Sequence, residues 1–130
     1  MTKEELINRN RKFAIDVLMT LELIPNDRVH DALVRQLVRS STSVGANYRA
    51  ACRAKSTADF INKLKIVEEE ADESSYFIDL LKEIDKGNNR ERLGELLTES
   101  NQLVSIYVAS LKTMKQKANE EKSKIVHRKS

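Results

Sequence analysis

Residues that interrupt helices are scarce in this sequence. Its 130 residues include three glycines and one proline, and aromatic residues make up only 5% of the chain. Glycine and proline are the residues that most disfavour a helix interior, so their scarcity, together with 33% charged residues, favours an all-α fold. No apolar run approaches the roughly 18 residues that a membrane span needs, and the polar N-terminal stretch has no signal-peptide core. We therefore expect a cytoplasmic protein without a membrane partner.

Residues that carry catalytic or metal chemistry are also scarce. The single cysteine, Cys52, excludes an intrachain disulfide, and we interpret it as a small packed side chain. His30 and His127 have no nucleophile or base motif around them, so we interpret both as surface residues. Glu70 and Glu73 have i, i+3 spacing, but no histidine completes the Glu-x-x-His pattern of carboxylate metal bundles. The sequence therefore predicts no enzyme activity, no metal and no cofactor.

The chain divides into four amphipathic segments with short polar connections. Pro25 ends the first segment, Asp27 or Asn26 can cap the second, and Ser56 can cap the third. The turn sequence KGNN precedes the fourth. We predict helices at about 2–23, 28–55, 57–85 and 90–118. They imply one domain, residues 1–118, folded as an antiparallel up-down-up-down four-helix bundle. The apolar period fades after Met114, and we expect the basic residues 119–130 to be frayed or disordered.

The stretch SSTSVGANY, residues 40–48, has the composition of a loop. The apolar period of the second segment nevertheless passes through it without a change of phase, from Leu37 through Val44 to Tyr48. A phosphate-binding loop would need a pattern such as GxxxxGK[ST], and this stretch has one glycine. We therefore interpret it as helix, with Gly45 pressed against another helix.

The opposite face of the second segment is basic. Residues 28–55 carry six basic residues and one acidic residue, a net charge of +5. Five arginines share one face: Arg28, Arg35, Arg39, Arg49 and Arg53. The C-terminal tail adds further cations: Lys122, Lys124, Arg128 and Lys129. These residues are candidates for contacts with RNA or DNA phosphates. The alternative is a solvated tail and a face whose arginines form ion pairs.

The third segment is acidic and has two apolar seams. Residues 56–86 contain nine acidic residues and four lysines, a net charge of −5. The main seam comprises Phe60, Leu64, Val67, Ala71, Ser74, Ile78 and Leu81. The second comprises Ile66, Glu70, Glu73, Phe77, Leu80 and Ile84. One seam fills a bundle, so we assign the second, with Gly45, to a possible subunit interface. Glu70 and Glu73 would then need cationic partners, which the arginines of the second segment can supply.

Three stretches carry a resemblance to a known family: RKFAIDVL (residues 11–18), LVRQLVRSSTSVGANYRAACRAKSTADFINKL (33–64) and KIVEEEADESSYFIDLL (65–81). The chain resembles the four-helix bundle proteins encoded in intervening sequences of bacterial 23S ribosomal RNA genes, also called S23-like. The resemblance implies an antiparallel bundle that assembles as a homopentamer with a central channel, and no established enzyme activity. The accessory variability protein of diversity-generating retroelements, which binds a reverse transcriptase and nucleic acid, is similar more distantly.

Three functional interpretations follow from these features. The first is a non-enzymatic, self-associating bundle whose cellular role the sequence does not name. The second is a ring that binds or chaperones nucleic acid, RNA above all, through its arginines. The third is a scaffold for a protein partner. Phosphate binding weakens steeply with salt, whereas docking on an apolar surface does not, so ionic strength separates the last two.

Overall fold

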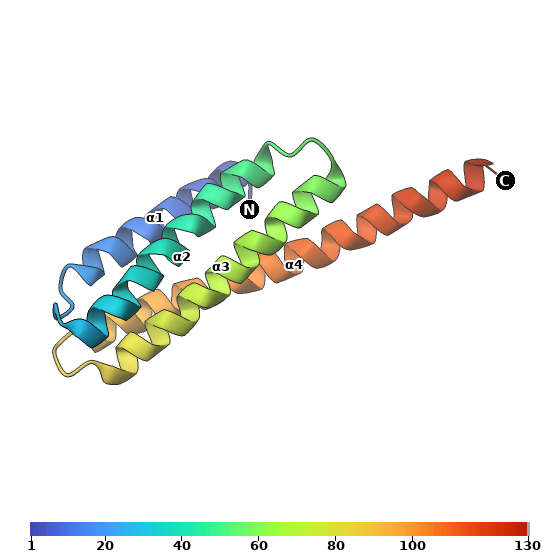
Figure 1. The fold of residues 1–130 in the computed structure, drawn as a ribbon. Helices are drawn as coiled ribbons and strands as arrows, with labels where there is room; N and C mark the ends of the chain where they lie inside the picture. The colour runs from blue at the N-terminus through green and yellow to red at the C-terminus, as the bar shows by residue number, and fades with distance from the viewer. Residues whose placement is uncertain (130) are drawn as a thin grey trace.

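The structure of the chain, a computed structural model, describes the backbone of residues 1–129 and the side chains of residues 1–127. This part of the chain contains four helices and no strand, which confirms the all-α prediction (Figure 1). The helices are α1 (Lys3–Leu21), α2 (Arg28–Cys52), α3 (Thr57–Ile84) and α4 (Arg90–Lys129).

Side-chain caps fix where the first three helices begin. Thr2 accepts a hydrogen bond from the backbone N–H of Glu5 at 3.1 Å, and the Glu5 carboxylate accepts one from the backbone N–H of Thr2. Asp27 caps α2 by accepting from the N–H of His30 at 2.9 Å. Ser56 caps α3 by accepting from the N–H of Asp59 at 3.0 Å, as predicted. Each cap satisfies an N–H group that the first helical turn leaves without a partner.

The helices pack side by side into a bundle. The α1–α2 and α3–α4 connections lie at one end, and the α2–α3 connection lies at the other (Figure 1). α3 packs extensively on α2 and on α4, whereas α1 packs less extensively on α2 and α4. The exposed side of α2 is therefore flanked by α1 and α3.

One continuous core lies between the helices. Every residue of the predicted main seam of α3 is buried except Phe60, which is half-buried and packs against the core. From the other helices Phe13, Leu37 and Leu103 are at most 1% exposed. Small polar pairs sit within this core: the Ser74 and Ser40 hydroxyls are 3.0 Å apart, and those of Ser75 and Ser100 are 2.7 Å apart. Small residues at these positions let the helix backbones approach closely.

The C-terminal segment differs from the prediction. We expected residues 119–130 to be frayed or disordered, but α4 continues without interruption to Lys129. The physical reason is that no glycine or proline follows Gly94, and the segment is rich in lysine and glutamate, which favour helix. A helix that is already nucleated in the bundle extends through such residues without an apolar period. Ser130 lies outside the described residues.

Candidate nucleic-acid interface

The five predicted arginines of α2 lie on its solvent side. All five side chains are exposed, while Leu37, Val44 and Tyr48 on the other side of α2 are buried. The helical period that runs through residues 40–48 produces this separation, since that stretch is helix as predicted. From Arg28 to Arg53 the exposed face, which we call the arginine face, extends about 37 Å at 1.5 Å per residue.

One member of the arginine face, Arg39, is paired within the chain. Its Nη2 lies 2.6 Å from Oε1 of Glu73, and its Nη1 lies 3.3 Å from Oε2 of Glu70. The hydrogen bond to Glu73 and the charges of both carboxylates raise the pKa of Arg39. The Glu70 side chain is only 17% exposed, so it depends on this partner for compensation of its charge. The expected pairing of the α3 carboxylates with α2 is thus made by Arg39 across the α2–α3 contact.

The other four arginines of this face have no such partner. Among the described side chains, no carboxylate lies within 4.0 Å of Arg28, Arg35, Arg49 or Arg53. Guanidinium groups that are exposed and unpaired can donate hydrogen bonds to phosphate oxygens in a bidentate manner.

A further arginine, Arg11 of α1, borders this face and has no ion pair in the part of the chain that the structure describes. Arg11 and Arg49 line the same groove between α1 and α2, together with the small residues Thr42 and Ala46. Sequence reasoning missed Arg11 because its position beside Arg49 depends on how α1 packs on α2. From the sequence, Arg11 is one arginine on the polar side of α1. Without knowing how α1 packs on α2, nothing in the sequence places it beside Arg49.

The cations of the tail are placed apart from the bundle. Lys122 and Lys124 are exposed near the end of α4. The end of this helix continues past the α2–α3 connection (Figure 1). The structure does not bring the two lysines into the groove that contains Arg11 and Arg49. Arg128 and Lys129 fall within helix α4, but their side chains lie outside those that the structure describes.

The predicted subunit-interface residues lie along one edge of α3. Ile66 is 42% exposed, and the other members are half-buried: Glu70, Glu73, Phe77, Leu80 and Ile84. Gly45 lies elsewhere, where α2 crosses α1. A Cβ placed on Gly45 would lie 3.4 Å from Cβ of Asn10, so the close approach that this glycine permits is made within the chain.

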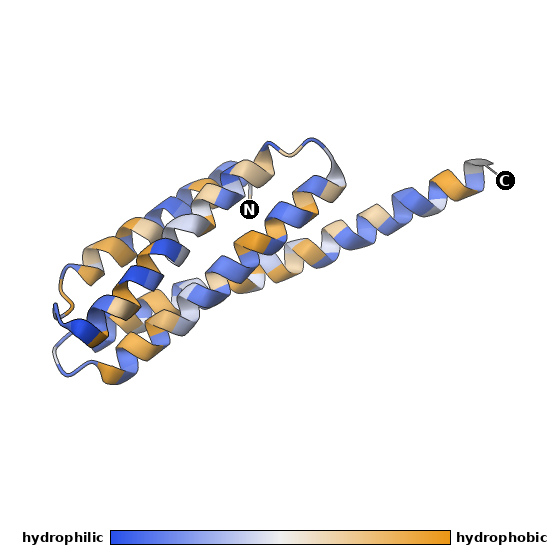
Figure 2. Cartoon of the chain, in the orientation of Figure 1, coloured by the Kyte–Doolittle hydropathy of each residue, from blue (hydrophilic) through white to orange (hydrophobic). Residues whose placement is uncertain are grey.

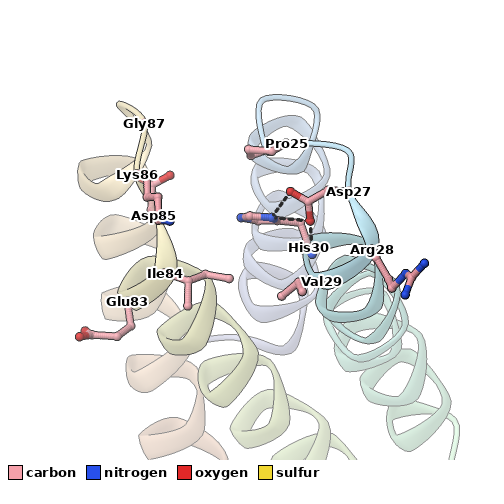
Figure 3. Close-up of a pocket in the computed structure, with 10 residues that line it drawn as sticks. All are labelled: Pro25, Asp27, Arg28, Val29, His30, Glu83, Ile84, Asp85, Lys86 and Gly87. Carbon is pink, nitrogen blue, oxygen red and sulfur yellow. Dashed lines mark hydrogen bonds and ion pairs between the residues drawn. The ribbon is translucent and has the colours of Figure 1, made fainter.

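A pocket at the end of the bundle lies between the start of α2 and the end of α3 (Figure 3). The Nδ1 atom of His30 is 2.9 Å from both carboxylate oxygens of Asp27, and the His30 side chain is 17% exposed. His30 is thus a half-buried residue at the end of the bundle, where the Asp27 cap holds its ring against the helix end. Hydrogen bonds from the backbone N–H and then the ring of His30 lower the pKa of Asp27.

The composition of this pocket indicates a structural role for the histidine. Its ten lining residues include no serine, threonine or cysteine that could act as a nucleophile beside the His30–Asp27 pair. Within the described part of the chain, no three histidine, cysteine or carboxylate side chains come together as metal ligands. We therefore assign the pair to capping of α2.

Within residues 1–129, none of the helices combines the length and the hydropathy of a membrane span. A comparison with curated proteins gives no match. Among solved structures, the chain is similar to a protein of unknown function from the S23 ribosomal protein family of Bacteroides thetaiotaomicron VPI-5482. The two share 30% sequence identity with a TM-score of 0.76, over 86% of this chain and 99% of the other.

The family model described as 23S rRNA-intervening sequence protein matches residues 2–109. This match covers α1, α2, α3 and the first half of α4. It includes all three stretches on which the resemblance rests and confirms that prediction. The chain belongs to the 23S rRNA-intervening sequence protein family.

Proposed function

We propose that this protein acts in the cytoplasm by binding rather than by catalysis. Copies of the antiparallel, up-down-up-down bundle associate with one another, and the arginine face of each copy contacts nucleic-acid phosphates. The family resemblance implies five copies in a ring. Such an arrangement repeats the arginine face by symmetry, so the fields of the copies add together.

One observation carries this proposal: four arginines of α2 are exposed on one side of one helix, with no carboxylate partner among the side chains of residues 1–127. Like charges held along a helix repel one another, and an anionic ligand relieves that repulsion. Duplex nucleic acid carries about one negative charge per 1.7 Å of its axis, so a face about 37 Å long meets many phosphates.

The same face favours recognition of the nucleic-acid backbone over recognition of bases. Arg35 and Arg53 are separated by Thr42, Ala46 and other small or polar exposed residues, with no exposed aromatic side chain among them. Stacking on aromatic rings is the usual means of holding unpaired bases. We therefore assign to this face a structured, double-stranded RNA segment as the ligand class.

The test is binding of a fluorescently labelled RNA hairpin, measured by anisotropy at two salt concentrations. The triple variant Arg28→Gln/Arg35→Gln/Arg53→Gln should bind at least about tenfold more weakly and show a smaller salt dependence, because it loses phosphate contacts. The matched control, Lys65→Gln/Lys86→Gln/Arg92→Gln, removes the same charge from exposed positions on other elements. Equal losses in the two variants, or no binding by the unaltered protein, would contradict the proposal.

A protein partner is the second candidate, and exposed apolar residues of α1 favour it. Within α1, Ile15, Leu18 and Met19 are each between 39% and 59% exposed. Their spacing places them on neighbouring positions of the helix surface. Binding through this surface would persist at high salt and would not respond to the arginine variant, which separates it from the first proposal.

A further inference from the structure

The end of α4 extends beyond the rest of the bundle. Ala118 is the last residue of α4 that packs against the core, and residues 119–127 are all exposed. Figure 1 shows this segment continuing alone past the α2–α3 connection. The family match ends at residue 109, so the segment lies outside the matched part of the chain. We call the part of α4 from Lys115 onward the arm.

One side of the arm combines lysines with apolar residues. Lys115, Ala118, Lys122, Ile125 and Val126 follow one another at spacings of three, four, three and one, within an arc of about 100° on the helix. Ile125 is 52% exposed and Val126 is 66% exposed (the hydrophobic turn near the end of α4 in Figure 2). Within the described side chains, neither lysine lies within 4.0 Å of a carboxylate. This side of the arm is therefore both cationic and apolar.

The two acidic residues of the arm lie away from that side. Glu120 and Glu121 are about 40° or more outside the arc that contains Lys122 and Val126. Lys124 lies on the opposite side of the helix from Lys122, about 160° away. The arm thus has one side free of acidic residues, and Lys124 provides a matched position outside it.

The outer side of α3 has the complementary composition. Glu69, Asp72, Tyr76, Asp79 and Glu83 are exposed and follow one another at spacings of three and four, which makes a single line along the helix that we call the acidic stripe. Tyr76, at its centre, is 60% exposed. Of the four carboxylates, only Glu83 has an ion pair in the described structure, a solvent-exposed one with Arg90 at 3.7 Å.

The charge of this region is concentrated enough to affect a neighbouring group. Burial, followed by the charges of Asp72 and Glu69, raises the pKa of Glu68, which lies beside the stripe. A cationic partner would relieve this repulsion. The exposed ring of Tyr76 would at the same time offer an apolar surface.

We propose that the arm of one chain docks on the acidic stripe of a second copy. Lys115 and Lys122 face the carboxylates, and Ile125 and Val126 pack on Tyr76. With Ile125 and Val126 over Tyr76, Lys122 lies about 5 Å along the helix from that ring, level with Asp72 or Asp79. Lys115 then lies about 5 Å past the last carboxylate of the stripe, a gap that an extended lysine side chain spans. The arm cannot reach the stripe of its own chain, since α4 leads it away from the bundle as one continuous helix (Figure 1).

This contact joins two different surfaces, so each copy offers both an arm and a stripe. Such a contact closes into a ring or continues as a chain of copies. The inference deepens the proposed self-association and does not depend on nucleic-acid binding by the arginine face. The contact between arm and stripe would be an additional link between subunits in the assembly of this protein.

The test uses full-length chains and sedimentation equilibrium over a range of protein concentrations. Lys115→Glu/Lys122→Glu should weaken association between copies about tenfold, because two attractive contacts become repulsive. Asp72→Lys/Asp79→Lys should weaken it similarly. Mixing these two proteins should restore association, since the reversed arm of one then faces the reversed stripe of the other. The control Lys124→Glu, with a charge change on the other side of the arm, should leave association within about twofold of the unaltered protein.

Two results would overturn the inference. Unchanged association in Lys115→Glu/Lys122→Glu would show that copies assemble without the arm, and would leave the proposed self-association intact. The second result is that Lys124→Glu weakens association as much as Lys115→Glu/Lys122→Glu does, and that mixing the arm and stripe variants does not restore it. That result would show that the effect comes from net charge. Loss of RNA-hairpin binding without a change in association would place the arm on nucleic acid instead.

Discussion

At the scale of single residues, a buried hydrogen bond between Tyr107 and Asn10 joins α4 to α1. The Tyr107 hydroxyl donates to the side-chain carbonyl of Asn10, and both residues are fully buried. The Nδ2 atom of Asn10 has no partner among the described residues. Burial raises the pKa of the Tyr107 hydroxyl, so this group stays protonated and remains a donor. The pair gives α1, which packs least extensively, a specific attachment to α4.

Replacement of Tyr107 by Phe tests the value of this hydrogen bond. The variant keeps the ring but leaves both polar atoms of Asn10 buried without partners, so the free energy of unfolding should fall by about 1–3 kcal/mol. Urea denaturation followed by circular dichroism measures the change. The double variant Asn10→Leu/Tyr107→Phe removes the stranded amide and should recover part of the loss. An unchanged free energy of unfolding in Tyr107→Phe would show that this hydrogen bond does not contribute to stability.

At the scale of elements, the crossing of α1 and α2 depends on Gly45. A Cβ at this position would lie 3.4 Å from Cβ of Asn10, so a methyl group would fit there in van der Waals contact with α1. Glycine costs about 1 kcal/mol relative to alanine in a helix interior. Glycine at this position therefore lowers the helix propensity of α2, while the contact with α1 would accept one methyl group.

Substitutions of increasing size at Gly45 test this explanation. Gly45→Ala should change the free energy of unfolding by less than about 1 kcal/mol, because the gain in helix propensity offsets the tighter contact. Gly45→Val should destabilise the bundle by about 1–3 kcal/mol, because its branches overpack against α1. Thermal or urea unfolding of the two variants provides the measurement. Equal stability of the valine and alanine variants would contradict close packing at this crossing.

The same scale shows which helices the sequence could predict. The caps at Asp27 and Ser56 and the apolar period of α3 depend on neighbours in the sequence, and the structure confirms them. The prediction for the end of α4 was wrong because it took the loss of the apolar period as the end of the helix. Residues with high helix propensity are sufficient to continue the helix there. Val29 is apolar but 63% exposed, because it lies at the very start of α2.

At the scale of the whole molecule, the charges of α2 and α3 are separated on different surfaces. The helical period alone places the α2 arginines on one face, so the sequence was sufficient to predict that surface. It could not identify which arginine is neutralised or that Arg11 joins Arg49, because these features depend on contacts between helices. Nor did it single out Tyr76, whose exposure depends on which side of α3 the bundle covers.

Self-association is the claim on which the functional proposals depend, because it repeats the arginine face and brings arms to stripes. The most direct test is the mass of the full-length protein in solution, measured by light scattering on a size-exclusion column at low and moderate salt. The account predicts a particle of several chains, with five implied by the family resemblance. A mass equal to one chain of 14.9 kDa at all concentrations would contradict it.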